Sequence, residues 1–461
     1  MLPALAATFL LALAGGAGAQ PAADGAVACP AALPADTRCF TGRDPGGAYH
    51  WIAIPKAWNG SLVVHEHGGP SLKTPAQDDP AADLQRFAVT VAEGFAWAGS
   101  SYRHAGFGVR DAAADSDNLR KIFWARFGRP KHTLLHGQSW GAGVAAKTAE
   151  LYGADGSGQP VYDGVILTSG VLGGGTRSYD FRADLRAVYQ YYCHNLPGPE
   201  DTPYPLWQGL AADAKLKRED LANRIDACTG LDLPAASRSP AQQRNLRNIL
   251  AVIRIPERTL KSHMDWASFT FRDLVVRQLD GRNPFSNEGV VYSGSDDDAA
   301  LNRGVERFAA TQAGVDALAH DADLTGELRA PTLTLHAEDD PTAFVELESV
   351  YRDLVERAGR GQLLVQSFTD EHEHQKEATP EYAALFRAMI AWIERGEKPT
   401  PRSLAAACED ARRTYGEACH FEPGFVPKPL ATRVYPRSKP APTQAAPSGV
   451  RTQIIRSERS R

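Results

Sequence analysis

The feature that most limits how this chain can fold is the stretch 131–143, which reads KHTLLHGQSWGAG. A short apolar run ends in Gly-Gln-Ser-Trp-Gly, and small residues follow it in AGVAAKTAELY. This pattern predicts a buried strand that turns sharply into a helix. Glycines two positions away on either side of Ser139 leave room for the strained backbone of such a turn. Ser139 is therefore either an ordinary residue of a glycine-rich turn or a nucleophile held at its apex.

Strands and helices alternate through much of the remaining chain. Apolar, β-branched runs predict the strands, and apolar residues every three or four positions predict the helices. Thr379, Pro380 and Gly396 fit the N-cap, the first position and the C-cap of the last helix. The alternation predicts an α/β fold with a mostly parallel sheet covered by helices on both faces. The expected strands are 49–55, 61–67, 96–102, 132–137, 162–170, 330–340 and 362–370, and the expected helices are 117–128, 140–152 and 379–396.

One long segment, 176–325, departs from this alternation because it contains helical stretches and no convincing strand. We interpret it as a helical cap domain inserted between two strands, which divides the core into residues 20–175 and 326–400. Residues 401–461 form a C-terminal extension. From residue 425 onward this extension is basic and rich in proline and serine, which predicts a flexible tail. Such a tail could bind an acidic polymer or the cell envelope, or simply be solvated.

The N-terminus has the pattern of an export signal. An apolar segment is followed by Ala17-Gly18-Ala19, which predicts a signal peptide over residues 1–19 and a periplasmic or extracellular protein. No lysine or arginine precedes Arg38, so the amino terminus alone supplies the positive charge, and a membrane anchor is the alternative. No later segment is apolar enough to span a membrane, so we expect no stable membrane insertion after signal cleavage.

The six cysteines agree with export, because an even number of cysteines in an oxidising compartment favours disulfides. Six cysteines allow about 15 pairings, and we expect the local one, in which each bond closes a short loop. No C-x-x-C motif occurs, which disfavours a zinc site. The expected disulfides are Cys29–Cys39, Cys193–Cys228 and Cys408–Cys419.

At the serine turn the sequence resembles the α/β-hydrolase superfamily. The resemblance covers residues 45–175 and 326–396 and implies that Ser139 is a nucleophile. Members of this superfamily hold part of their oxyanion hole in a loop after an earlier strand, and here His-Gly-Gly-Pro follows SLVVHE. By position, the backbone N–H groups of Gly69 and Trp140 would stabilise the oxyanion.

The resemblance also implies an acid and a histidine later in the chain, in that order. The acid would follow a late strand, and TLHAEDDPTAF fits with Ala337 where glycine is usual. Counting three residues on favours Asp340, with Glu338 and Asp339 as alternatives.

The histidine would lie between the last strand and the last helix, in SFTDEHEHQKEATPEY. Glu373 stands where the superfamily often has glycine, so both His372 and His374 are candidates. The distance back from the helix start favours His374.

These residues together predict a serine hydrolase that forms an acyl-enzyme intermediate and needs no metal or organic cofactor. Carboxylic ester hydrolysis is the first choice. Amide or peptide hydrolysis is the alternative, because His-Gly-Gly-Pro also occurs in resembling peptidases. The substrate would be a small-molecule or oligomeric ester or amide. The net charge of −5 gives no whole-molecule attraction to nucleic acid. Oligomeric state is left open.

Three other interpretations compete with this one. A zinc hydrolase could use two His-x-His pairs, His65 with His67 and His372 with His374, because residues two apart on a strand face the same way. Calcium could bind GSDDDAALN at 294–302, although acids at a helix N-terminus explain that segment as well. A binding protein that retains a hydrolase fold is the third.

Overall fold

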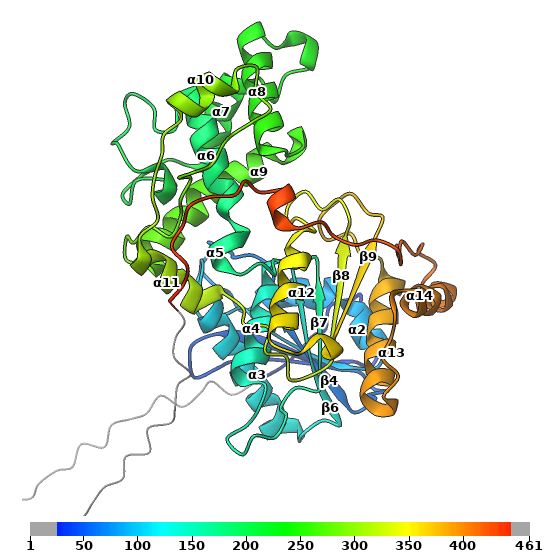
Figure 1. Ribbon diagram of the computed structural model, residues 1–461. Helices are drawn as coiled ribbons and strands as arrows, with labels where there is room; N and C mark the ends of the chain where they lie inside the picture. The colour runs from blue at the N-terminus through cyan, green and yellow to red at the C-terminus, as the bar shows by residue number, and fades with distance from the viewer. Residues whose placement is uncertain (1–24, 444–461) are drawn as a thin grey trace, which may run out of the picture.

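The computed structural model describes residues 25–443. A nine-stranded sheet runs through its centre in the order β1-β2-β3-β5-β4-β6-β7-β8-β9 (Figure 1). The pairs β1–β2, β2–β3 and β3–β5 are antiparallel, and every pair from β5 to β9 is parallel. The predicted α/β fold is confirmed, because a mostly parallel sheet is flanked by helices. The strands are β1 (Gly25–Val27), β2 (Arg38–Arg43), β3 (Tyr49–Ile54), β4 (Ser61–Glu66), β5 (Ala96–Ser100), β6 (His132–Gln138), β7 (Gly164–Thr168), β8 (Thr332–Ala337) and β9 (Leu364–Thr369).

The central strands are buried on both faces. Every residue of β4, β5, β7 and β8 is buried, as expected for parallel strands that are covered by helices on both faces. The strands β3 and β4 follow one another in the chain but are not paired. Instead β5 lies between them, antiparallel to β3 and parallel to β4.

Helices cover the two faces of this sheet in two separate packing layers (Figure 1). Side chains of α3, α4 and α12 form one hydrophobic cluster with the sheet, and those of α2, α13 and α14 form another on the opposite face. These helices are α2 (Ala88–Ala92), α3 (Val109–Phe127), α4 (Trp140–Tyr152), α12 (Leu347–Arg357), α13 (Thr379–Arg395) and α14 (Pro401–Tyr415). The short helix α1 (Asp79–Arg86) packs with β3 and β5 in a smaller cluster.

The ends of α13 differ in part from the prediction. Gly396 is the C-cap as expected, in the left-handed conformation with φ 70°. Thr379, however, is not the N-cap but the first helical residue, because its N–H and hydroxyl both donate to Glu417. Ala378 is the N-cap instead, and its N–H donates to the carboxylate of Glu381.

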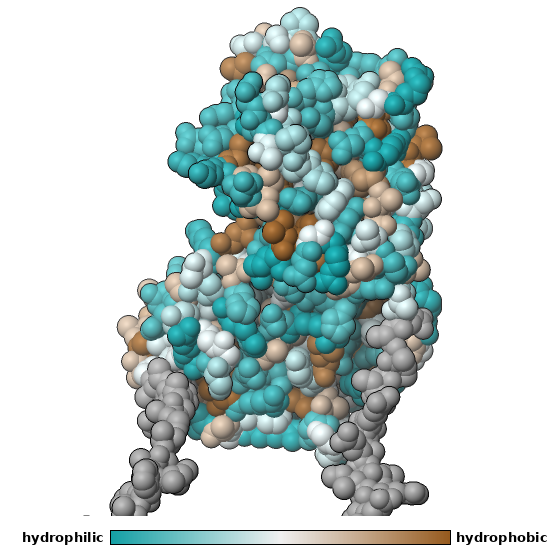
Figure 2. Space-filling view, turned by 90° about the vertical axis from the view of Figure 1, so that its left-hand side faces the viewer, coloured by the Kyte–Doolittle hydropathy of each residue, from teal (hydrophilic) through white to brown (hydrophobic). Residues whose placement is uncertain are grey.

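A helical segment lies between β7 and β8 and rises above the carboxyl ends of the parallel strands (Figure 1). Figure 2 shows it as an upper lobe separated by a notch from the body below. Its hydrophobic cluster is continuous with Phe107 and Trp140 of the sheet domain, so the two parts share packing. Its elements are α5 (Gly175–Ser178), α6 (Asp180–Cys193), η1 (Leu206–Gln208), α7 (Arg218–Thr229), η2 (Ala235–Ser237), α8 (Pro240–Ile253), η3 (Glu257–Thr259), α9 (Leu260–Asp265), the π-helical η4 (Trp266–Thr270) and η5 (Asp273–Gln278), α10 (Asp298–Gly304) and α11 (Gln312–Ala322).

All three expected cysteine pairs are disulfide bonded, Cys29–Cys39, Cys193–Cys228 and Cys408–Cys419. The first joins the N-terminal segment to β2, the second joins α6 to α7, and the third closes the loop after α14. Disulfides of this number are typical of proteins in an oxidising compartment. Within residues 25–443, no helix is both long enough and apolar enough to cross a membrane.

The C-terminal segment 425–443 lies against the helical insertion, so the prediction of a flexible tail is wrong for these residues. Arg437 pairs with Asp184 at 2.7 Å, and Lys439 pairs with Asp180 at 2.8 Å, both acids being on α6. Composition does not reveal these buried carboxylates, which need cationic partners. Figure 1 shows the segment in orange and red as it crosses from the sheet to the insertion. Residues 444–461 and the predicted signal peptide lie outside the described residues.

We expect Arg437→Ala to lower the free energy of unfolding by about 3–5 kcal/mol, because it leaves the buried carboxylate of Asp184 without its partner. Burial raises the pKa of Asp184, and Arg437 opposes that rise. Urea unfolding at pH 7, followed by circular dichroism, measures the change. Arg413→Ala is the control, because it breaks an exposed pair with Asp410 and should leave stability nearly unchanged. Equal losses in the two variants would contradict the role of the buried pair.

Candidate active site

Ser139 occupies a strained turn between β6 and α4. Its backbone has φ 59° and ψ −126°, a conformation that residues other than glycine rarely adopt. The Ser139 N–H donates to the carbonyl of Thr168 at 2.9 Å, and the Ser139 carbonyl accepts from the N–H of Val171 at 3.1 Å. Both the N–H and the C=O of Ser139 are therefore hydrogen-bonded to the backbone at the end of β7 and just after it.

The two glycines of the Gly-x-Ser-x-Gly motif are required by close backbone contacts. A Cβ at Gly137 would lie 2.2 Å from the carbonyl oxygen of Gly141. A Cβ at Gly141 would lie 2.3 Å from the carbonyl oxygen of Glu66 and 2.6 Å from that of His67. The second contact means that the serine turn packs directly against the start of the His-Gly-Gly-Pro loop.

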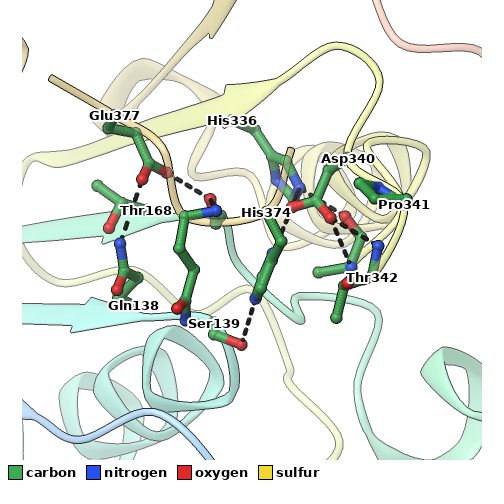
Figure 3. A network of polar contacts seen from close by, with 12 residues as sticks. Gln138, Ser139, Thr168, His336, Asp340, Pro341, Thr342, His374 and Glu377 are labelled. Atoms are coloured by element: carbon green, nitrogen blue, oxygen red, sulfur yellow. Dashed lines mark hydrogen bonds and ion pairs between the residues drawn. The ribbon is translucent and has the colours of Figure 1, made fainter. Parts of the chain in front are cut away.

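His374 and Asp340 lie in line with Ser139 (Figure 3). His374 Nε2 is 2.9 Å from Ser139 Oγ, and His374 Nδ1 is 2.6 Å from Asp340 Oδ2. The three side chains come from the turn after β6, the loop after β8 and the loop after β9. Because these strands are parallel, their carboxyl ends meet at the same edge of the sheet, which brings residues 34 and 235 positions apart in sequence into contact.

The alternative candidates lie elsewhere. His372 and Asp339 contact each other at 3.1 Å, with side chains 67% and 74% exposed, and neither contacts Ser139. Glu338 makes its backbone bond to Thr369 and also does not reach the line of contacts. Of the residues considered at the sequence level, the structure therefore brings together Ser139, His374 and Asp340.

The Asp340 carboxylate is buried and fully hydrogen-bonded. Its Oδ1 accepts from the N–H groups of Thr342 at 2.7 Å and Ala343 at 2.9 Å, and Figure 3 shows Thr342 beside it. Burial alone would raise the pKa of Asp340. The charges and hydrogen bonds of His374 and His336 outweigh burial and hold this pKa well below its usual range. The carboxylate therefore stays ionised at neutral pH.

His336 is a second histidine beside this carboxylate, which the sequence analysis missed. Its Nε2 donates to the carbonyl of Ala343 at 2.7 Å and lies 3.4 Å from Asp340 Oδ2, while its Nδ1 lies 3.2 Å from Glu348 Oε1. The other oxygen of Glu348 accepts from Thr334 and Gln366. An ionised Glu348 can only accept hydrogen bonds, so His336 Nδ1 must be the donor in this contact. Because Nε2 also donates, His336 carries protons on both ring nitrogens.

The pKa of His336 agrees with this assignment. Burial opposes the charged form, but the Asp340 and Glu348 carboxylates raise the pKa of His336 to about 10. No motif in the sequence signals this group. The only feature of the sequence that points to it is the position of His336 four residues before Asp340. Its partner Glu348 lies on a separate helix, α12.

The loop that carries His374 is held by a second polar network, part of which is shown in Figure 3. Glu377 accepts from Gln138 Nε2 at 3.2 Å and from the hydroxyl of Ser169. Arg86 on α1 donates to the carbonyl and the side-chain oxygen of Gln375, both at 3.0 Å. Two residues that follow the imidazole are thus tied to β6, to the residue after β7 and to α1. Sequence reasoning missed Glu377 and Arg86, because no local pattern links them to the site.

The His-Gly-Gly-Pro loop passes beside the serine turn. A Cβ at Gly68 would lie 3.4 Å from the Gln138 carbonyl oxygen and 3.9 Å from Ser139 Cβ. Gly69 has φ 152°, and Trp140 opens α4, so its N–H has no acceptor within the helix. Gly69 follows Gly68 in this loop and Trp140 follows Ser139 in the turn, so both residues predicted for the oxyanion hole are sequence neighbours of the contact between loop and turn.

His67 anchors the loop by contacting Asp83 at 2.6 Å. Burial would raise the pKa of Asp83, but hydrogen bonds and charges of His65 and His67 hold it far below its usual range. The two histidines of this His-x-His pair thus share one carboxylate. Between residues 25 and 443 no group of three histidine, cysteine or acidic side chains is placed to hold a metal ion. In the calcium candidate, Asp297 caps α10 by accepting from the Ala300 N–H at 2.8 Å.

No protein-family model matches the sequence, and no curated protein matches it. Solved structures similar to this chain include lipase A from Candida antarctica, with 11% identity, a TM-score of 0.43, and coverage of 87% of this chain and 86% of that one. Feruloyl esterase B from Aspergillus oryzae shares 15% identity, with a TM-score of 0.42 and coverage of 82% and 87%. The tannin acyl hydrolase from Aspergillus niger shares 12%, with a TM-score of 0.37 and coverage of 83% of each chain. Because these TM-scores lie below 0.5, we base no conclusion about chemistry on them.

We expect the stability difference between wild type and His336→Gln to depend on pH. A pKa raised from about 6.5 to about 10 stabilises the fold fully below pH 6.5, and this contribution disappears as pH rises through 10. The difference in free energy of unfolding should therefore shrink by on the order of 2–4 kcal/mol between pH 6 and pH 10. Urea unfolding at a series of pH values measures it. A difference that is constant with pH would mean that His336 is neutral in the folded protein.

Proposed function

We propose that this protein is a serine hydrolase that cleaves carboxylic esters through an acyl-enzyme intermediate. The observation that carries the proposal is the line of contacts from Ser139 Oγ through His374 to Asp340, at 2.9 Å and 2.6 Å. It stands at a strained turn between the parallel strand β6 and the helix α4. Strain of this kind persists where function requires it.

The protonation of the three groups determines their roles. The ionised Asp340 accepts only, so His374 Nδ1 must carry the proton of that bond, and Nε2 is left as an acceptor. The Ser139 hydroxyl then donates to Nε2, which is the geometry required for general-base catalysis. During attack on an ester carbonyl, His374 takes the serine proton. Asp340 stabilises the resulting imidazolium.

The developing oxyanion would be stabilised by the N–H groups of Gly69 and Trp140. Removal of one such donor typically costs about 3–4 kcal/mol of transition-state stabilisation. The alcohol leaves with the proton from His374, and a water molecule activated by the same imidazole then hydrolyses the acyl-enzyme on Ser139.

We propose that the helical insertion acts as a cap over this site. Ser139 is only 8% exposed, and the cluster of the insertion includes Trp140, the residue after the nucleophile. We also propose that the protein is exported to the periplasm or beyond the cell. The three disulfides and the predicted signal peptide support that location.

The proposal is tested by labelling with a fluorophosphonate probe, which reacts with activated serine hydroxyls. Intact mass should show one adduct on wild type and none on Ser139→Ala. Ser71→Ala, a neighbouring exposed serine, is the control and should still be labelled. No adduct on folded wild type would refute an activated serine. Matched esters and anilides then decide between ester and amide hydrolysis.

A second test concerns the acid. Asp340→Asn should lower kcat by about 10⁴-fold while the protein stays folded, because an amide donor facing Nδ1 forces the wrong imidazole tautomer. Asp339→Asn, one residue away and exposed, should change kcat little. Hydrolysis of p-nitrophenyl acetate measures both. A large loss in Asp339→Asn, with Asp340→Asn active, would assign the acid to the neighbouring residue.

A further inference from the structure

A buried arginine near the proposed site has no polar partner. Arg182, on the first turn of α6, is only 6% exposed. Its Nε is buried without a hydrogen-bond acceptor, and its guanidinium makes no hydrogen bond or ion pair with any residue between 25 and 443. Such a group is costly, because a buried charge is normally paired or hydrogen-bonded.

Aromatic rings surround this guanidinium. Its carbon lies 4.5 Å from the ring centroid of Phe181, 4.6 Å from that of Trp266 and 5.9 Å from that of Tyr179. Cation–π contacts stabilise the charge through the faces of the rings. They supply no acceptor for the N–H groups, which lie in the plane of the guanidinium. The donors therefore remain free for an acceptor that approaches along that plane.

The other buried cations near α6 differ from Arg182, because each makes at least one hydrogen bond or ion pair through its guanidinium. Arg186, one turn later on the same helix, also has its Nε and Nη1 buried without acceptors, but its Nη2 donates to the carbonyls of Leu196 at 3.0 Å and Gly209 at 3.1 Å. Arg437 pairs with the Asp184 carboxylate. Of these three arginines, only Arg182 has a guanidinium without any acceptor among residues 25–443.

Chains of side-chain contacts link Arg182 to both sides of the proposed catalytic site. From the serine side, the rings of Trp140, Phe107, Tyr179 and Trp266 follow one another at 5.9, 5.7 and 4.4 Å, and Trp266 contacts Arg182.

From the acid side, the carbonyl of Pro341, next to Asp340, accepts from His263 Nε2 at 2.9 Å. His263 packs on Phe181, which contacts Arg182. Burial lowers the pKa of His263 to about 3, so this imidazole is neutral.

Asp340 does not satisfy Arg182. It is the only carboxylate of the described residues whose charge acts appreciably on Arg182, and its oxygens are already occupied by Thr342, Ala343 and His374. Burial lowers the pKa of Arg182 to about 10, which still leaves it charged at neutral pH. The guanidinium of Arg182 therefore lies within electrostatic range of Asp340 and keeps donors that no described residue accepts.

We propose that Arg182 binds a carboxylate of the substrate, so that the enzyme prefers esters that carry an acidic group near the scissile bond. A single guanidinium matches a singly charged carboxylate in charge and in its two-pronged geometry. The aromatic rings around it would contact the apolar part of the same substrate. This inference rests on the proposed function and specifies its substrate class.

The experiment compares esters that differ only in a free or methylated carboxyl group. One pair places the carboxyl on the acyl side, p-nitrophenyl hydrogen glutarate and its methyl ester. The other places it on the alcohol side, 4-acetoxybenzoate and its methyl ester. Wild type should prefer the acid member of at least one pair. Arg182→Met should lose about 10- to 100-fold in kcat/KM on that acid and change little on its neutral partner.

Two further variants separate binding from folding. Arg182→Lys keeps the positive charge but lacks the two-pronged geometry of the guanidinium, and it should retain part of the preference for the acidic ester. Arg247→Met, an exposed arginine on α8 whose partner is Asp296, should behave as wild type. A wild type that cleaves both members of each pair equally, or an Arg182→Lys variant that loses both equally, would overturn the inference.

A binding measurement without turnover distinguishes this inference from the proposed function. In the Ser139→Ala background, monomethyl glutarate or 4-hydroxybenzoate should raise the melting temperature, and Arg182→Met should abolish that shift. Carboxylate binding that needs Arg182, together with failed fluorophosphonate labelling, would refute the serine hydrolase but retain the anion site. Successful labelling without any carboxylate binding would retain the hydrolase and refute the anion site.

Discussion

The buried negative charge of Asp340 organises this end of the sheet. A carboxylate cannot be taken from water without replacement partners, and here two backbone amides, the imidazolium of His336 and the ring of His374 supply them. His336 in turn contacts the carboxylate of Glu348. Glu348 accepts hydrogen bonds from Thr334 and Gln366 on two adjacent strands. One charge therefore connects the loop after β8 to the strands and helix beneath it.

The opposite side of the site depends on close backbone packing rather than charge. Gly141 permits the first turn of α4 to touch the carbonyls of Glu66 and His67, which brings the serine turn and the His-Gly-Gly-Pro loop into one unit. His67 then ties that loop to α1 through Asp83, and Arg86 on the same helix holds the loop of His374. The short helix α1 thus contacts both loops that border Ser139.

The sequence was sufficient for the features that depend on local pattern. Most of the central strands, the helices α4 and α13, the serine turn and the cysteine pairs follow from periodicity, glycine spacing and proximity along the chain, whereas β1, β2, α1, α2, α12 and α14 were not predicted. For the acid and the histidine nearest Ser139, the sequence left neighbouring candidates open. Asp339 and Asp340 differ only in which one faces the serine, and so do His372 and His374.

Other features depend on distant residues and left no local pattern in the sequence. His336, Glu377 and Arg182 gain their surroundings from elements far away in the chain, so their environment could not be inferred from their neighbours. The tail was misjudged for the same reason, since its partners Asp180 and Asp184 lie more than 250 positions earlier.

The C-terminal segment also changes the mechanics of the molecule. The helical insertion leaves the sheet after β7 and returns before β8, and a lobe attached only at those two points could swing about the line that joins them. The pairs of Arg437 and Lys439 with α6 tie the insertion to the C-terminal segment, in addition to its packing against Phe107 and Trp140. Rotation of the insertion about that line would therefore require these buried ion pairs to break.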